Sequence, residues 1–150
     1  LERVRSGKIM DYSPITGKRI KDKDGKSHIS WMHKQPYNLK QCLFGLHLTK
    51  EDKSKTIAVV ESEKTAVIMS MYVSDFLWLA TGSKSGFKKE YLCMIKTRKI
   101  IGFPDKGCFN EWQERADDLN NFGYNITISD IIEKSNCDDG LDIADLYLKL

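Results

Sequence analysis

Apolar and β-branched residues run without interruption over residues 56–60 and stop at an acid, Glu61. Such a run is typical of a strand buried on both faces of a parallel sheet. Residues 62–73 predict a helix, because Ser62 can cap its amino terminus and Glu63 lies in the first turn, where the helix dipole favours an anion. Glu61 is therefore expected at the carboxyl end of a central strand, the edge at which open α/β sheets bind ligands. A solvated turn acid is the alternative interpretation of Glu61.

Short apolar runs and amphipathic segments alternate through the rest of the chain. Strands are predicted at 76–80, 99–103 and 125–128, and helices at 88–97, 109–122 and 140–148. This alternation favours a mainly parallel four-stranded sheet flanked by helices, with Trp78 and Trp112 in its core. The Gly/Ser loop over 81–86 is a candidate for binding phosphate through its backbone N–H groups.

The amino-terminal residues have a different pattern, in which short strand candidates are separated by turn residues. Strands are predicted at 8–12 and 28–33, a turn at 13–17, and a type I′ hairpin turn at Asp24-Gly25. We therefore expect a small β-hairpin element with a connector over residues 1–50, and an α/β domain over residues 51–150.

Charge is unevenly distributed between these two parts. Residues 1–55 hold 13 Lys and Arg against 6 Asp and Glu, a net charge of +7. Residues 56–150 hold 11 against 15, a net charge of −4. A basic amino-terminal part joined to an acidic remainder of the chain favours an anionic partner, such as DNA or RNA, for the basic part. A merely solvated surface is the alternative.

The basic hairpins also carry aromatic residues. Tyr12 and Trp31 lie close to several basic side chains, so the element can hold a phosphate backbone and stack a base. The alternative is that these aromatics pack the hairpin onto the main domain. The candidate phosphate contacts of this element are Lys18, Arg19 and Lys21.

Cysteine usage and hydropathy limit the class of protein. The four cysteines, at positions 42, 93, 108 and 137, are far apart and have no zinc-ligand spacing, so we expect reduced core thiols and a cytoplasmic protein. No run of about 18 apolar residues predicts a membrane span. The chain begins at Leu1 rather than Met, so we expect a piece of a longer protein with further domains.

Acids follow two of the predicted strands at the same edge of the sheet, Glu61 and Asp105. Such carboxylates are the hard oxygen ligands that Mg²⁺ prefers, or they divide into a metal ligand and a general acid/base. Asp142 and Asp145 are three residues apart and share one face of the last predicted helix. The lysines that accompany these acids are candidate phosphate contacts: Lys64, Lys84 and Lys106.

Three segments resemble the motifs of the Toprim family. Residues 59–66, Val-Val-Glu-Ser-Glu-Lys-Thr-Ala, resemble its first motif, a hydrophobic strand followed by Glu-Gly and a helix. Residues 103–107, Phe-Pro-Asp-Lys-Gly, resemble the second motif, a strand followed by Asp-x-Asp. Residues 140–148 resemble the Lys-Asp-x-Asp-Asp/Glu-x-Leu tail of primase-type Toprim domains. The whole chain also resembles the Toprim-containing, primase-like proteins of mobile elements in Bacteroides-type bacteria.

The resemblance implies a Toprim-like α/β fold over about residues 56–150 and Mg²⁺-dependent nucleotidyl or phosphoryl transfer in DNA replication. Glu61 would be the acid/base and Asp105 a metal ligand, with nucleotides as candidate substrates. Gly107 stands where the second metal-binding Asp of the family is expected. Asp142 and Asp145 would compensate as ligands if the last helix folds back over the strand edge. The alternative is a catalytically degenerate Toprim domain that acts as a nucleic-acid-binding or structural module of a larger mobile-element replication protein.

Overall fold

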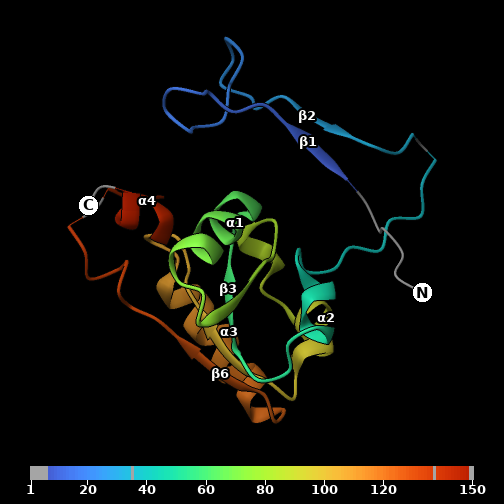
Figure 1. Ribbon diagram of the computed structural model, residues 1–150, viewed down its shortest axis with the longest axis vertical. Coiled ribbons are helices and arrows are strands. Elements are labelled where there is room, and N and C mark those ends of the chain that lie inside the picture. Colours follow the sequence, from blue (N-terminus) through green and yellow to red (C-terminus); the bar gives the residue numbers. More distant parts are fainter. Residues whose placement is uncertain (1–6, 35, 137, 149–150) are drawn as a thin grey trace. The chain divides into compact units, whose positions relative to one another are not determined.

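The computed structural model describes residues 7–34, 36–136 and 138–148, and the chain divides into two compact units, with the boundary in the sequence between Gln41 and Cys42 (Figure 1). The boundary lies earlier than the expected one at residue 50, because residues 42–50 of the connector belong to the larger unit. Leu43 is buried in its hydrophobic core, and Phe44 exchanges two backbone hydrogen bonds with Ala80.

The larger unit is an α/β domain whose four strands are parallel, as predicted. The strands, in the spatial order β4-β3-β5-β6, are β3 (Thr56–Val60), β4 (Phe76–Ala80), β5 (Lys99–Gly102) and β6 (Asn125–Ile128). The α-helices are α1 (Glu63–Tyr72), α2 (Lys89–Leu92), α3 (Phe109–Asn121) and α4 (Ile143–Leu148). Short 3₁₀ turns are η1 (Leu46–Lys50), η2 (Lys84–Gly86) and η3 (Cys93–Ile95). None of the described helices is long and apolar enough to cross a membrane.

Helices cover both faces of this sheet, which explains the unbroken apolar run of β3. Ile57 and Val59 belong to the core cluster that contains Trp112 of α3. Ala58 and Val60 belong to the cluster on the opposite face, together with residues of α1 and α4. These four β3 side chains are fully buried. A strand enclosed on both sides has no face on which a polar residue is tolerated.

The face covered by α3 is packed closely at Gly102 of β5. Trp112 is fully buried and stacks on Phe87, with ring centroids 4.1 Å apart and an interplanar angle of 16°. A Cβ atom at Gly102 would lie 2.7 Å from Cδ1 of Ile128 and 3.1 Å from Cε3 of Trp112. Glycine at this position therefore allows the indole to lie against the sheet.

Both edge strands of the sheet have partners outside the parallel ladder. On β4, Ala80 pairs with Phe44 as an antiparallel bridge. On β6, the side-chain amide of Asn120 donates to the Ile126 carbonyl and accepts from the Ile126 N–H, both at 2.9 Å. A single amide thus satisfies both backbone groups that an edge residue exposes.

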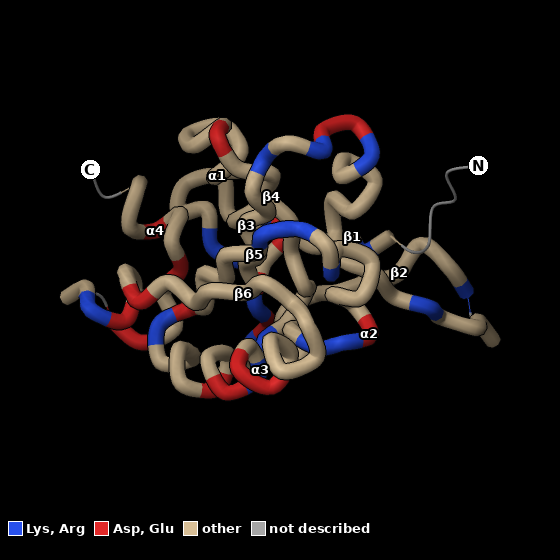
Figure 2. Tube along the Cα trace, turned by 90° about the horizontal axis from the view of Figure 1, so that it is seen from below, with Lys and Arg blue, Asp and Glu red and all other residues tan. Residues whose placement is uncertain are grey.

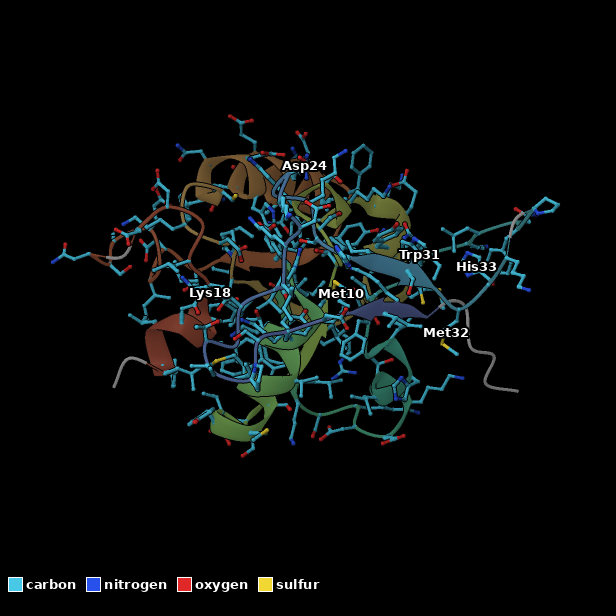
Figure 3. The ribbon with its side chains drawn as sticks, turned by 90° about the horizontal axis from the view of Figure 1, so that it is seen from above. Met10, Lys18, Asp24, Trp31, Met32 and His33 are labelled. Carbon is cyan, nitrogen blue, oxygen red and sulfur yellow. The ribbon has the colours of Figure 1, made fainter. Side chains whose placement is uncertain are left out.

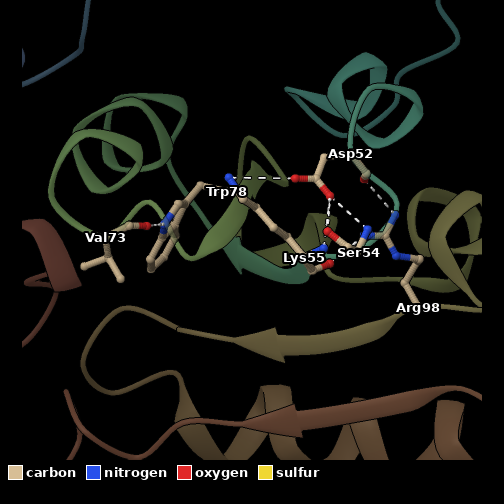
Figure 4. A network of polar contacts seen from close by, with 6 residues as sticks. All are labelled: Asp52, Ser54, Lys55, Val73, Trp78 and Arg98. Carbon is tan, nitrogen blue, oxygen red and sulfur yellow. Dashed lines mark hydrogen bonds and ion pairs between the residues drawn. The ribbon is translucent and has the colours of Figure 1, made fainter.

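The polar loop before β3 is fixed by hydrogen bonds (Figure 4). Oδ1 of Asp52 accepts from the Ser54 hydroxyl at 2.8 Å and from the backbone N–H groups of Lys55 and Ser54, and these bonds lower the pKa of Asp52 to about 2. The Arg98 guanidinium donates to the carbonyls of Asp52 and Lys55. Arg98 therefore joins this loop to the segment that leads into β5.

The smaller unit contains β1 (Lys8–Met10) and β2 (Ile29–Trp31), which pair antiparallel as predicted. The turn at 13–17 is also confirmed. The type I′ turn at Asp24-Gly25 is wrong: that turn needs a positive φ at both central residues, and of the two only Gly25 has one, at +77°. Instead, Oδ1 of Asp22 accepts from the N–H groups of Asp24 and Lys26 and shapes a longer turn.

Three further predictions need correction. The helix predicted at 88–97 is shorter, because α2 ends at Leu92 and continues only as the 3₁₀ turn η3. Ser62 occupies the N-cap position of α1, but its side chain makes no capping hydrogen bond. Cys42 and Cys93 are exposed free thiols rather than core residues, and Cys108 is half-buried. Cys137 lies outside the described residues.

Candidate functional site

The sheet has a topological switch point between β3 and β5. These strands are parallel neighbours, but the chain leaves them in opposite directions, because β3 leads through α1 to β4 and β5 leads through α3 to β6. Open α/β sheets bind ligands at the carboxyl edge of such a switch point. Glu61 directly follows β3, and Asp105 lies in the loop after β5. The structure thus brings together the two acids that the sequence predicted for this edge.

Glu61 is a buried residue, only 9% exposed, so the alternative of a solvated turn acid is wrong. Its carboxylate accepts hydrogen bonds from the Cys108 thiol and from the backbone N–H of Asp105. Its Oε1 atom is buried and has no hydrogen-bond partner among the described residues. Burial raises the pKa of Glu61, and the two hydrogen bonds offset part of this rise. A carboxyl group with a raised pKa is suited to proton transfer near neutral pH.

Cys108 contacts Glu61, a role that the sequence did not suggest. It occupies the N-cap position of α3. Burial, followed by the negative charge of Glu61, raises the pKa of the Cys108 thiol to about 11. The thiol therefore stays protonated at neutral pH and donates to Glu61, and it lacks the thiolate character of a nucleophile.

Three charged side chains form an exposed network beside this edge. Nζ of Lys84 lies 2.6 Å from one carboxylate oxygen of Glu111, and Arg115 lies 2.6 Å from the other. The bond to Glu111 raises the pKa of Lys84, and the bond to Lys84 lowers the pKa of Glu111. Arg115 also donates to the Lys84 carbonyl at 3.1 Å. Lys84 is close enough to act electrostatically on Glu61, but a phosphate would have to compete with Glu111 for its ammonium.

The Gly/Ser loop over 81–86 uses much of its backbone within the protein. The N–H groups of Thr81 and Gly82 donate to the carbonyls of Val60 and Glu61, at 3.0 and 2.8 Å. The N–H of Gly86 donates within the loop. The first two donors hold the loop on the end of β3 and the third closes the loop itself, so these three N–H groups do not form the predicted phosphate cradle.

The segment that resembles the second Toprim motif, residues 103–107, ends in a turn rather than in a second carboxylate. Gly107 has a φ of +85°, a left-handed conformation that an Asp rarely adopts. Its N–H donates to the carboxylate of Glu133 at 2.9 Å. The ammonium of Lys106 donates to the carbonyls of Glu133 and Ser135. Lys106 therefore fixes the loop that follows β6 and is not placed as a phosphate contact.

The segment before α4 does return to this edge, since the N–H of Lys106 donates to the Leu141 carbonyl at 2.9 Å. The two acids there have structural partners. The Asp142 carboxylate accepts from the Asp145 N–H at 3.0 Å, and the Asp145 carboxylate accepts from the Asp142 N–H at 3.1 Å. Asp142 also accepts a hydrogen bond from the buried hydroxyl of Thr65. This reciprocal pair is a capping box, so both acids stabilise the start of α4.

The remaining predicted contacts lie elsewhere. Lys64 is half-buried in the first turn of α1. Lys18, Arg19 and Lys21 are exposed on the hairpins of the smaller unit. In the larger unit, acidic residues lie along α3 and in the loop after β6 (Figure 2).

The donor set at the edge fits a magnesium ion that is bound together with phosphate. Over the residues described, no group of three or more His, Cys, Asp and Glu side chains is arranged to hold a metal ion. However, Mg²⁺ commonly takes only one or two protein carboxylates, and waters and substrate phosphates supply the other ligands. Asp105 provides one such carboxylate, and beside it Glu61 provides an acid/base whose buried Oε1 has no hydrogen-bond partner among the described residues.

Fold and site together define an α/β domain with two carboxylates at the switch point of its sheet. The chain belongs to the DUF6371 family, described as a domain of unknown function, which matches residues 1–106. The match spans the smaller unit and the first half of the α/β domain, and it includes Glu61 and Asp105. No curated protein and no solved structure matches the chain.

The variant Glu61→Gln tests the raised pKa of Glu61. Because the folded-state pKa lies above the usual value of 4.5, the wild type loses stability as the pH rises from 4.5 through the folded-state pKa. We expect the free energy of unfolding of Glu61→Gln, measured by urea denaturation, to fall less over this window. Glu111→Gln is the control with the opposite sign in a lower window, since the lowered pKa of Glu111 contributes stability that is lost as the pH falls below 4.5. Parallel pH profiles for the wild type and Glu61→Gln would contradict the assignment.

Proposed function

We propose that the edge between β3 and β5 is a Toprim-type site for nucleotidyl or phosphoryl transfer. The observation that carries the proposal is the pairing of a buried Glu61, whose pKa is raised, with Asp105 at the switch point of the sheet. The motif resemblance at residues 59–66 and 103–107 supports the same assignment. The expected substrates are nucleotides or the phosphodiesters of DNA or RNA.

The residues have separate roles in this proposal. Glu61 holds or releases a proton, because burial brings its pKa towards neutral pH. Asp105 is the ligand that would hold Mg²⁺, and a bound Mg²⁺ would neutralise charge on the transferred phosphoryl group. The Cys108 thiol orients the Glu61 carboxylate by its hydrogen bond. Lys84 adds positive charge beside Glu61.

Calorimetric titration with Mn²⁺ tests the metal-binding part of the proposal, because Mn²⁺ prefers carboxylate and water ligands as Mg²⁺ does. We expect saturable binding to the wild type and at least about a tenfold loss of affinity in Asp105→Asn, which removes a charged ligand. Asp117→Asn is the matched control, since Asp117 is an exposed acid on α3. Equal binding by the wild type and Asp105→Asn, or no binding at millimolar Mn²⁺, would overturn the metal role of Asp105.

One observation favours a second candidate function. Gly107 replaces the second carboxylate, and Asp142 and Asp145 cap α4, so the site has few metal ligands. A domain of this kind can act as a nucleic-acid-binding or structural module without catalysis. Its distinguishing property is binding to DNA or RNA that weakens with salt and needs no Mg²⁺.

A further inference from the structure

The smaller unit exposes large apolar side chains. Trp31 is 44% exposed and Met32 is 73% exposed. None of the described residues of this unit belongs to either hydrophobic core cluster of the protein. Exposed aromatic and apolar groups gathered on a small element mark an interaction surface.

Three of its aromatic side chains lie in a row, in which His33 and Tyr37 are stacked and the Trp31 ring is tilted by 41° relative to His33. The His33 ring lies on the Tyr37 ring, with centroids 3.7 Å apart and an interplanar angle of 21°. The Trp31 ring follows at 5.9 Å from His33. Trp31 and His33 lie together at the β2 end of the unit, away from the turns at Lys18 and Asp24 (Figure 3). We call Trp31, His33 and Tyr37 the aromatic ladder.

The unit that carries the aromatic ladder is positively charged as a whole. Residues 1–41 hold 10 Lys and Arg against 4 Asp and Glu, a net charge of +6. Lys8 is the direct cross-strand neighbour of Trp31, so the two side chains lie on the same face of the hairpin. An exposed aromatic ring beside cationic side chains has the chemistry that stacks a base and neutralises its phosphate.

We propose that the aromatic ladder binds single-stranded nucleic acid, with an unpaired base stacked on Trp31 and the backbone neutralised by Lys8 and the basic hairpins. A duplex is excluded as the preferred ligand because its bases are already stacked on one another, whereas single-stranded bases offer a free π-face. This surface is carried by the smaller unit alone, and it does not rest on the function proposed for Glu61 and Asp105.

Tryptophan fluorescence of the intact 150-residue chain reports on this surface. The other two tryptophans, Trp78 and Trp112, are only 4% and 0% exposed, so a stacked base would quench Trp31 selectively. Titration with an oligothymidylate of about 20 nucleotides, enough for at least one site of this kind, should therefore quench the emission. The affinity, followed with a labelled oligonucleotide, should fall steeply with salt.

Matched variants separate base stacking on Trp31 from other causes of oligonucleotide binding. We expect Trp31→Ala to bind the oligothymidylate about 5- to 100-fold more weakly, and Trp31→Phe, which keeps an aromatic face, to lie much closer to the wild type. Ile15→Ala is the control, because Ile15 is 93% exposed on the same unit outside the ladder. The oligonucleotide titrations are made in EDTA, because stacking and phosphate neutralisation need no Mg²⁺. Failure of the metal site and failure of this surface are therefore distinguishable.

Three results would overturn the proposal. The first is wild-type affinity in Trp31→Ala, and the second is an equal loss of affinity in Ile15→Ala. The third is binding of a duplex of the same length as tightly as the single strand. Each would show that base stacking on the aromatic ladder does not determine binding.

Discussion

We expect Trp112→Ala to lower the free energy of unfolding by about 3–5 kcal/mol, the range for truncating a large buried aromatic residue. Trp112 is fully buried, stacks on Phe87, and lies against the sheet where Gly102 leaves room for it. Truncation would open a cavity between α3 and the sheet. Since domains of this size are stable by about 5–15 kcal/mol, the loss should be visible as a large shift of the urea unfolding midpoint.

The control for this prediction is Trp112→Phe. The indole Nε1 is buried and has no hydrogen-bond partner within the described part of the chain. Phenylalanine keeps a ring against Phe87 and removes a polar N–H that gains nothing from burial. We therefore expect Trp112→Phe to be clearly more stable than Trp112→Ala. Equal losses in the two variants would show that the stacked ring contributes little to the stability of this core.

We expect Asp142→Ala to lower the free energy of unfolding by about 2–4 kcal/mol. Loss of a helix N-cap costs about 1 kcal/mol. Loss of the acceptor for the buried Thr65 hydroxyl adds about 1–3 kcal/mol, because that hydroxyl would be left without its hydrogen bond. Urea denaturation followed by far-ultraviolet circular dichroism measures the difference.

Asp142→Asn decides between the structural role of Asp142 and the metal-ligand role that the sequence suggested. Asparagine is an equally good N-cap residue through its single oxygen, and its amide N–H can donate to the Thr65 hydroxyl where the carboxylate accepted from it. The structural role therefore predicts a stability within about 1 kcal/mol of the wild type. It also predicts unchanged Mn²⁺ binding. Wild-type stability combined with a loss of Mn²⁺ affinity would instead identify Asp142 as a ligand.

The strands of the larger unit could be predicted from sequence because burial on both faces leaves a clear signal. The residues predicted for the central strand, 56–60, are those of β3. Its side chains pack into a core cluster on each face of the sheet, as expected for a strand covered by helices on both sides. The helix at 88–97 was overextended because Leu92 and Ile95, three residues apart, suit a 3₁₀ turn as well as an α-helix. The turn at Asp24-Gly25 was misassigned because a glycine with positive φ occurs in several hairpin types.

The site was predictable only where chain order determines position. Glu61 and Asp105 follow parallel strands, so their position at the same edge of the sheet could be inferred from the sequence alone. Asp142 and Asp145 have the spacing of a capping box as well as that of two ligands on one face, and sequence spacing does not choose between them. The contact of Cys108 with Glu61 depends on the turn after β5, which leaves no periodic signal in the sequence.

The Asn120 amide and the Phe44 backbone have a consequence for assembly. They occupy hydrogen-bonding groups of Ile126 and Ala80 that an incoming extended peptide would need for strand addition. A second copy of the chain meets the same obstruction, so edge-to-edge polymerisation of this sheet is disfavoured at both borders. Partners of the α/β domain are therefore expected to dock through side-chain surfaces rather than by adding a strand to the edge of the sheet.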